Sequence, residues 1–130
     1  MKINDIGGEF GLIDRLSKRT RTSHPELIMG IGDDAAVIGH AFSNGDYLLV
    51  TTDMLVEQSH FKCQWATAEQ IGIKSVACNV SDVAAMGGKP TFMFVSFALK
   101  PDTEIEWVEA LYQGMGDACR RYGVVLAGGD

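Results

Sequence analysis

Residues 67–99, TAEQIGIKSVACNVSDVAAMGGKPTFMFVSFAL, contain the pattern of a long helix followed directly by the pattern of a strand. Thr67 is a helix-capping residue type, and the acidic and amide side chains that follow it suit a first helical turn. Apolar residues then recur at helical spacing until the Gly87-Gly88 pair, which ends the helix. The next segment, residues 91–99, is dense in Phe and Val and predicts a buried strand.

Downstream of this stretch, the sequence predicts one more helix and one more strand. Residues 103–122 form the second helix pattern, with Thr103 as the N-cap, acidic residues in the first turn and basic residues in the last. Gly123 ends this helix, and residues 124–127 predict a short final strand. The second half of the chain therefore alternates helix and strand.

Shorter patterns precede residue 67. Residues 10–21 carry apolar side chains on one side and basic ones on the other, which predicts a short amphipathic helix. Residues 35–38 and 47–52 predict two strands, joined by a connection whose Asn44-Gly45 pair favours a hairpin. The whole order predicts an α/β (α+β) sandwich, in which a mixed sheet carries two main helices on one face.

Length and charge limit the possible functions. With 130 residues and no linker rich in Pro and Ser, the chain is expected to form one domain. The net charge of -6 argues against a nucleic-acid-binding surface, which needs Lys and Arg to neutralise phosphates. The longest apolar stretch is about half the length of a membrane-spanning helix, and the first residues lack the hydrophobic region of a signal peptide. We therefore expect a cytoplasmic protein without a membrane partner.

The sequence assigns no special chemistry to its thiols or to its aromatic run. No CxxC spacing occurs, so neither a disulfide framework nor a zinc site is predicted for the three cysteines, Cys63, Cys78 and Cys119. We expect reduced, mostly buried thiols, with Cys78 and Cys119 in the core. The run Phe92, Phe94 and Phe97 is also interpreted as core, because no basic residues interleave it.

Four acidic clusters lie in predicted loops or at positions that disfavour an aspartate. They are centred on Asp33-Asp34 before the first strand of the hairpin, Asp53 after the second, Asp82 inside the long helix and Asp130 after the last strand. Asp82 has no basic residue among its helical neighbours, and an unpaired acid in such a place is costly to bury. A divalent cation would satisfy it.

Magnesium fits this pattern of oxygen ligands. Proteins usually supply one or two carboxylates to each magnesium ion, while phosphates and waters complete its shell. Phosphoryl transfer depends mainly on positioning and charge neutralisation, so such a site needs no covalent nucleophile. The sequence has neither a Walker loop nor a dinucleotide fingerprint.

Taken singly, each acidic cluster also fits an ordinary turn, and His60 fits a packed or exposed histidine as well as a ligand-binding one.

Four motifs follow one another along nearly the whole chain. They are GIGDDAA at residues 30–36, TTDMLVE at residues 51–57 with His60-Phe61, NVSDVAAMG at residues 79–87, and Gly128-Gly129-Asp130. In this order and at this spacing they resemble the thiamine-monophosphate kinase family. The segment EFGLI at residues 9–13 also resembles the opening of that family.

The resemblance implies a reaction and a set of site residues. The reaction is ATP-dependent phosphorylation of thiamine monophosphate to thiamine diphosphate, by direct in-line transfer with several magnesium ions and no covalent catalytic residue. By motif position the metal ligands would be Asp34, Thr51, Thr52, Asp53, Asp82 and Asp130. His60 would contact the acceptor, and Gly129, Asp130 and Tyr112 would bind ATP.

The resemblance also implies an architecture. The wider superfamily also includes aminoimidazole ribonucleotide synthase, selenophosphate synthetase and a hydrogenase maturation factor. The resemblance implies that its members have two α/β domains and form homodimers through the sheet of the first domain. Residues 1–130 resemble that N-terminal, ATP- and magnesium-binding domain, and we expect the C-terminal domain to follow Asp130 with a Thr at its start. The isolated domain is expected to bind metal and nucleotide poorly.

Two other functions stay open at this point. One is a different ATP-dependent synthase or maturation factor of the same superfamily, although the absence of a cysteine before Cys63 disfavours the selenophosphate branch. The other is a non-catalytic dimerisation module.

Gln58-Ser59 departs from the small pair that the family usually has before His60, and this difference affects how the acceptor would be contacted.

Overall fold

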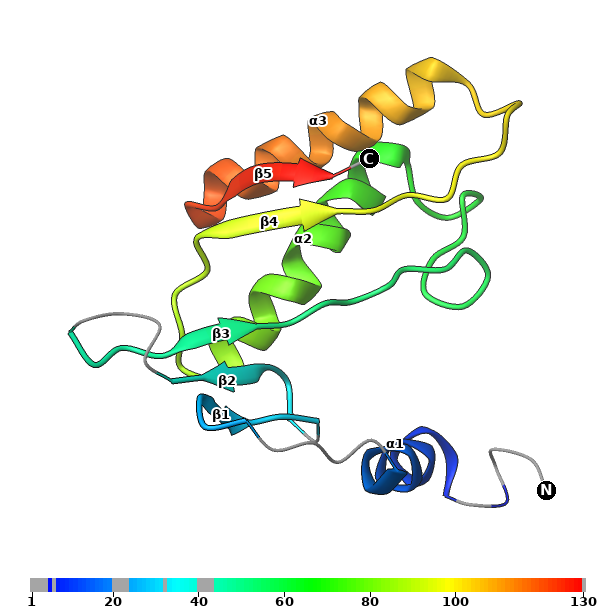
Figure 1. Cartoon of the computed structure of the whole chain (residues 1–130). Coiled ribbons are helices and arrows are strands. Elements are labelled where there is room, and N and C mark those ends of the chain that lie inside the picture. The colour runs from blue at the N-terminus through cyan, green and yellow to red at the C-terminus, as the bar shows by residue number, and fades with distance from the viewer. Residues whose placement is uncertain (1–4, 6, 20–23, 32, 40–43, 130) are drawn as a thin grey trace. The chain divides into compact units, whose positions relative to one another are not determined.

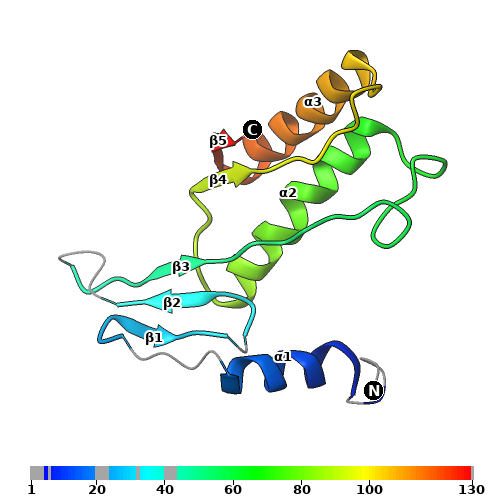
Figure 2. The same cartoon turned by 45° about the vertical axis from the view of Figure 1, so that its right-hand side comes forward.

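The computed structural model describes residues 5, 7–19, 24–31, 33–39 and 44–129. The chain divides into two compact units, Met1–Thr51 and Thr52–Asp130. Figure 1 shows the helices and strands of both units, and Figure 2 shows them turned by 45°. None of the helices in the described part of the chain combines the length and the apolar character needed to cross a bilayer.

The first unit consists of a helix and a three-stranded antiparallel sheet. Helix α1 spans Gly8–Arg19, so the predicted amphipathic helix is confirmed over most of its length; residues 20 and 21 lie outside the described part. The strands lie in the order β1-β2-β3 and have the bounds Leu27–Met29, Ala36–Ile38 and Leu48–Val50. Ala35, directly before β2, is the most buried apolar residue described in this unit.

The predicted hairpin is confirmed by the pairing of β2 with β3. Val37 lies opposite Leu49, and Ile38 opposite Leu48. In the connection, Gly45 has a φ of 85°, a conformation that glycine adopts without a steric penalty. Strand β1 was not predicted, because all of its residues are exposed and it lacks the alternating pattern that indicates a half-buried strand.

The second unit alternates helices and strands. Helix α2 (Ala68–Ala85) is followed by β4 (Phe92–Val95), α3 (Ile105–Tyr122) and β5 (Val125–Gly129). Strands β4 and β5 pair in parallel, with Met93 opposite Leu126. A parallel pair needs a crossover connection, which α3 provides. Both helices of this unit lie on the same side of the two strands (Figures 1 and 2).

The starts of the two long helices differ in how well the sequence predicted them. Helix α2 begins at Thr67 as predicted, and Thr67 is its N-cap and forms a complete capping box with Gln70. The prediction of Thr103 as the N-cap of α3 is wrong, because that position is taken by Glu104 without a side-chain cap. The N–H of Thr103 instead donates to the carbonyl of Lys100 at 3.0 Å, within the preceding turn.

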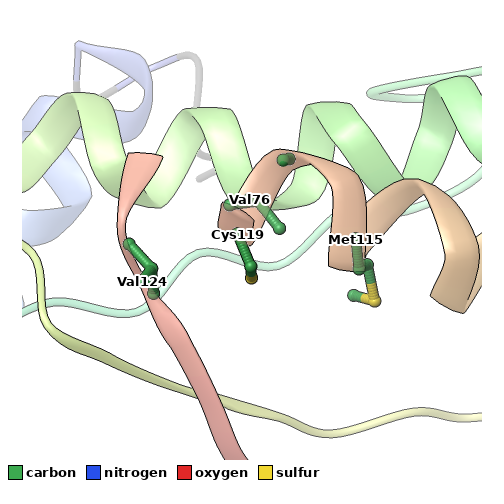
Figure 3. Close-up of a cluster of buried hydrophobic side chains, with 5 residues drawn as sticks. Val76, Met115, Cys119 and Val124 are labelled. Carbon is green, nitrogen blue, oxygen red and sulfur yellow. The ribbon is translucent and has the colours of Figure 1, made fainter. Parts of the chain in front are cut away.

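The core of the second unit lies between its helices and its strands. Figure 3 shows Val76 of α2 beside Met115 and Cys119 of α3, with Val124 directly before β5. Val76 is fully buried, and partly buried side chains of the strands, including Met93, pack against this cluster. The predictions of Cys119 as a core residue and of Gly123 as the end of α3 are confirmed.

The predicted α/β class is confirmed, but the described strands form two sheets instead of one mixed sheet. The prediction of a fully buried strand over residues 91–99 is wrong for one face of β4. Met93 and Val95 pack on the core, whereas Phe92 and Phe94 are 69% and 75% exposed. Successive side chains of a strand point to opposite faces, and within this unit only one face is covered by helices. Phe97 does contact the core.

Candidate functional site

Two of the predicted metal ligands meet in the first unit. Asp34 lies in a bend of the chain, where its N–H donates to Oδ1 of the preceding Asp33 at 2.9 Å. At the end of the neighbouring strand, Oγ1 of Thr51 donates to the carbonyl oxygen of Asp34 at 2.8 Å. Pairing of β2 with β3 therefore brings the first acidic motif against the start of the second.

In the second unit, Asp53 is held by α2. Its N–H donates to Oδ1 of Asn79 at 3.1 Å, and Nδ2 of Asn79 donates to the carbonyl of Ser75 at 3.0 Å. The two hydrogen bonds fix the orientation of the Asn79 amide, because its oxygen and its nitrogen are used in opposite directions. The Asp53 carboxylate is exposed and makes no ion pair with a described residue.

Cys78 lies beside the same carboxylate. It is half-buried, and its Sγ donates to the carbonyl of Ser75 at 3.3 Å. Partial burial, followed by the charge of Asp53 and a hydrogen bond to it, raises the pKa of the Cys78 thiol. The prediction of Cys78 as a core residue is therefore wrong in part, because this thiol is only half-buried and lies beside the carboxylate of a predicted ligand. The prediction that the thiols are mostly buried also fails for Cys63, which is exposed.

Asp82 is one turn further along α2 than Cys78 and Asn79. Residues three and four apart on a helix share a face, so these three side chains follow one stripe of α2. Asp82 is half-buried, because it lies on a helix whose other side packs into the core. The structure thus brings Asp53 to the turn of α2 that precedes Asp82.

The donor chemistry fits a hard cation. All the predicted ligands offer carboxylate or hydroxyl oxygens, the atoms that magnesium prefers. They belong to both units, and Asp130 lies outside the described residues. Within the described residues, no group of three or more His, Cys, Asp or Glu side chains that could hold a metal ion occurs. The metal ligands therefore stay a prediction.

The predicted acceptor contact, His60, lies in a tight loop of the second unit, Val56–Phe61, which we call the His60 loop. The N–H groups of Ser59 and His60 donate to the carbonyl of Val56 at 3.2 and 2.9 Å. Gln58 has a φ of 71°, an uncommon backbone conformation for a residue with a side chain, and its N–H donates to the carbonyl of Phe61 at 2.8 Å. These bonds give the loop a defined shape although it is exposed.

Two further hydrogen bonds engage His60 itself. Its Nδ1 accepts the N–H of Val56 at 3.0 Å. Its carbonyl oxygen accepts a hydrogen bond from Nζ of Lys74 on α2. Neither Lys74 nor the side chain of Asn79 was predicted as a site residue. An asparagine inside a helix, where its propensity is poor, is the signal that could have marked Asn79.

The residues predicted to bind ATP lie on α3 and β5. The ring of Tyr112 on α3 is partly exposed and packs against Phe97, with 5.5 Å between ring centroids. Gly129 is the last residue of β5 and lies opposite Val95 of β4. Asp130, directly after it, is outside the described part of the chain. Their role in binding ATP stays a prediction.

These features define a class of protein: an α/β domain that displays acidic motifs where its strands end and along one helix. The family described as AIR synthase related protein, N-terminal domain, matches residues 32–130. The chain belongs to this family.

Relatives with a more specific name cover almost the whole chain. The thiamine-monophosphate kinase of Bacillus subtilis is 40% identical over 122 residues, which are 94% of this chain and 37% of that protein. The thiamine-monophosphate kinase of Aquifex aeolicus is 39% identical over 130 residues, which are 100% of this chain and 39% of that protein. The chain thus spans a little over a third of the length of these relatives.

Solved structures agree in fold. The structure described as AaThiL complexed with AMPPCP and TMP has a TM-score of 0.84 and 37% sequence identity, and the match covers 99% of this chain and 38% of that one. A structure of thiamine monophosphate kinase from Aquifex aeolicus has a TM-score of 0.71 and 30% identity, again over 99% of this chain and 38% of the other. The sequence-based resemblance is therefore confirmed.

Proposed function

We propose that the chain is the N-terminal domain of a thiamine-monophosphate kinase, and that the whole protein phosphorylates thiamine monophosphate with ATP. One observation carries this proposal: a protein of 37% identity, whose fold matches 99% of this chain, was solved with AMPPCP, an ATP analogue, and TMP. The motifs of the acidic clusters and the His60 loop lie in the matched region. No separate feature of the described residues favours another acceptor.

The proposed reaction is a direct transfer. An oxygen of the thiamine monophosphate phosphate attacks the terminal phosphorus of ATP, the bond from that phosphorus to the bridging oxygen breaks, and ADP leaves with the electron pair. No covalent intermediate on the protein is required, because positioning and charge neutralisation supply most of the catalysis in such transfers. The predicted site residues, which are carboxylates and hydroxyls suited to holding magnesium, are consistent with such a transfer.

The site residues have proposed roles. Magnesium, when bound, would neutralise phosphate charge and align the reacting oxygens. Its ligands would be Asp34, Thr51, Thr52, Asp53, Asp82 and Asp130. His60 would contact the acceptor, and Gly129, Asp130 and Tyr112 would contact ATP. Asn79 would hold the backbone at Asp53 in place through the hydrogen bond between them.

We also propose that the protein is a cytoplasmic homodimer that pairs through the sheet of this domain. Support comes from the apolar side chains on β4 and β5 that the helices of the unit leave uncovered. Phe92, Phe94 and Val125 are 69%, 75% and 56% exposed. Exposed apolar side chains that cluster on one face are typical of protein interfaces. Neither a nucleic acid nor a membrane is proposed as a partner.

The decisive experiment is an assay of the protein at its native length with ATP, thiamine monophosphate and magnesium. We expect equal amounts of ADP and thiamine diphosphate, and loss of both products when EDTA replaces magnesium. ADP formation that depends on a different acceptor, with no thiamine diphosphate, would leave the family assignment intact and overturn the proposed acceptor. Thiamine itself is the matched control, because it lacks the phosphate that receives the transferred group.

A further inference from the structure

The imidazole of His60 has one ring nitrogen already engaged. Because Nδ1 accepts the N–H of Val56 at 3.0 Å, Nδ1 carries no proton in this arrangement. The proton of the neutral ring is then on Nε2, which makes Nε2 a hydrogen-bond donor. His60 is exposed, so a ligand in the surrounding solvent would meet the Nε2–H group.

The backbone of the same residue is tied to a helix. The ammonium of Lys74 donates to the carbonyl oxygen of His60, fourteen positions earlier in the chain. Lys74 follows directly after a part of α2 that is packed against α3, where Ile71 and Gly72 are buried. The bond therefore joins an exposed loop to a rigid part of the unit, and a hydrogen bond from a charged donor is stronger than one between neutral groups.

We propose that Lys74 is a positioning residue for His60: it holds the His60 loop against α2, so that the Nε2–H of the histidine is presented as a fixed donor to an oxygen of the phosphorylated acceptor. This inference rests on the proposed function, in which His60 contacts the acceptor. Lys74 acts through the loop and does not touch the substrate. Val56 sets which ring nitrogen carries the proton, and Lys74 sets where the ring lies.

The first test compares Lys74→Met, Lys74→Arg and Lys100→Met in the native-length protein. Lys74→Met should raise KM for the acceptor about tenfold and change kcat and KM for ATP less than about twofold, because the lost bond orders only the acceptor contact. Lys74→Arg, which keeps a cationic donor, should stay within about twofold of the wild type. Lys100→Met removes the same charge from an exposed position elsewhere in the unit and should have no effect.

Two results of this comparison would overturn the proposal. One is a Lys74→Met protein that matches Lys100→Met in every constant. The other is an equal loss toward ATP and acceptor, which would show a general effect on the site. If Lys74→Met lowers the melting temperature by several degrees, Lys74→Gln, which keeps part of the aliphatic stem and a neutral N–H donor, decides the question by the same measurements.

The second test does not depend on turnover. In the wild type, NMR of the ring nitrogens of neutral His60 should show a proton on Nε2 and an unprotonated Nδ1. Lys74→Met should broaden or shift these signals. Lys100→Met should leave them unchanged. Failure of the wild type to phosphorylate thiamine monophosphate would sink the proposed function, while these signals would still report on the loop. Identical signals in wild type and Lys74→Met would sink the positioning role, whatever the activity.

A pair of histidine variants tests the donor itself. The amide of Asn overlays the Nδ1 side of the ring, and the longer amide of Gln reaches the position of Nε2. Under the proposal, His60→Gln keeps a donor near Nε2 and should retain a KM for the acceptor at least about fivefold lower than that of His60→Asn. The reverse order would contradict the assignment of Nε2 as the presented atom.

Discussion

The N–H of Asp53 donates a hydrogen bond to Oδ1 of Asn79, 26 positions further along the chain and one turn before Asp82 on α2. This bond connects two of the acidic motifs within the second unit. This bond fixes the position of the backbone from which the Asp53 side chain extends, although the carboxylate itself is exposed. Asn79 therefore fixes the backbone at Asp53, a predicted ligand, without being a predicted ligand itself.

We predict that Asn79→Ala lowers the free energy of unfolding by about 1 kcal/mol, because the N–H of Asp53 and the carbonyl of Ser75 both lose a partner. Urea denaturation followed by circular dichroism measures this change. Asn79→Asp is the matched control for the acceptor alone: it keeps an oxygen for the Asp53 N–H but loses the donor to Ser75 and adds a negative charge. Equal stability of Asn79→Ala and wild type would show that the bond contributes nothing.

We predict that Asp82→Asn lowers the affinity of the native-length protein for magnesium-bound ATP analogue at least about tenfold, because an amide oxygen lacks the charge that a hard cation prefers. Isothermal titration at several magnesium concentrations provides the measurement. Asp102→Asn removes the same charge from an exposed turn and should bind like the wild type. Unchanged binding by Asp82→Asn would remove Asp82 from the predicted ligands.

A prediction on pH concerns Cys78, whose pKa is raised by partial burial and by the Asp53 carboxylate. The raised pKa keeps the thiol protonated, so in EDTA at about pH 8 Cys78 should alkylate more slowly than an unhindered thiol. Asp53→Asn removes the negative charge, lowers the pKa and should speed alkylation about two- to fivefold. Mass spectrometry of the Cys78 peptide measures the rate, and the Cys119 peptide is the internal control.

The same shift has a consequence for stability. A thiol with a higher pKa in the folded protein than in the unfolded chain favours folding as long as it is protonated. Its contribution is complete below the pKa of the unfolded thiol and is lost as the pH rises through the raised pKa of the folded one. The wild type should therefore lose stability on the alkaline side more steeply than Cys78→Ala, as measured by unfolding in urea across that range.

The crossing of α2 and α3 gives a prediction about packing. A Cβ at Gly72 would lie 2.1 Å from the carbonyl oxygen of Leu111, and a Cβ at Gly114 would lie 2.0 Å from the carbonyl oxygen of Glu69. Gly72→Ala or Gly114→Ala should therefore cost about 2 kcal/mol or more of unfolding free energy, because two backbones must separate. Gly116→Ala, whose Cβ would meet only Arg120 at 3.4 Å, should be neutral or stabilising.

The sequence predicted the elements that are set by local interactions. Helix α2 begins where expected because Thr67 and Gln70 satisfy each other within one turn, and α3 ends at Gly123 because a left-handed residue is needed there. The start of α3 was missed, since Thr103 is held by the turn that begins at Lys100. Capping preference alone does not reveal a competing turn.

Features that depend on distant partners were harder to predict. The pattern of β4 is apolar at every position, so it could not show that Phe92 and Phe94 face away from the helices. The acidic motifs marked Asp53 and Asp82, but the bond between Asp53 and Asn79 forms only when the fold of the second unit brings residue 53 to α2. Lys74 lies outside every motif, and only the fold brings it to His60.

The close crossing of α2 and α3 also constrains motion. Helices that slide past each other do so by repacking side chains between them, and at Gly72 and Gly114 no such layer exists. The close backbone contact at these two glycines therefore opposes sliding of α2, which carries Lys74, along α3, which carries Tyr112. We expect any rearrangement of this unit to take place in its loops.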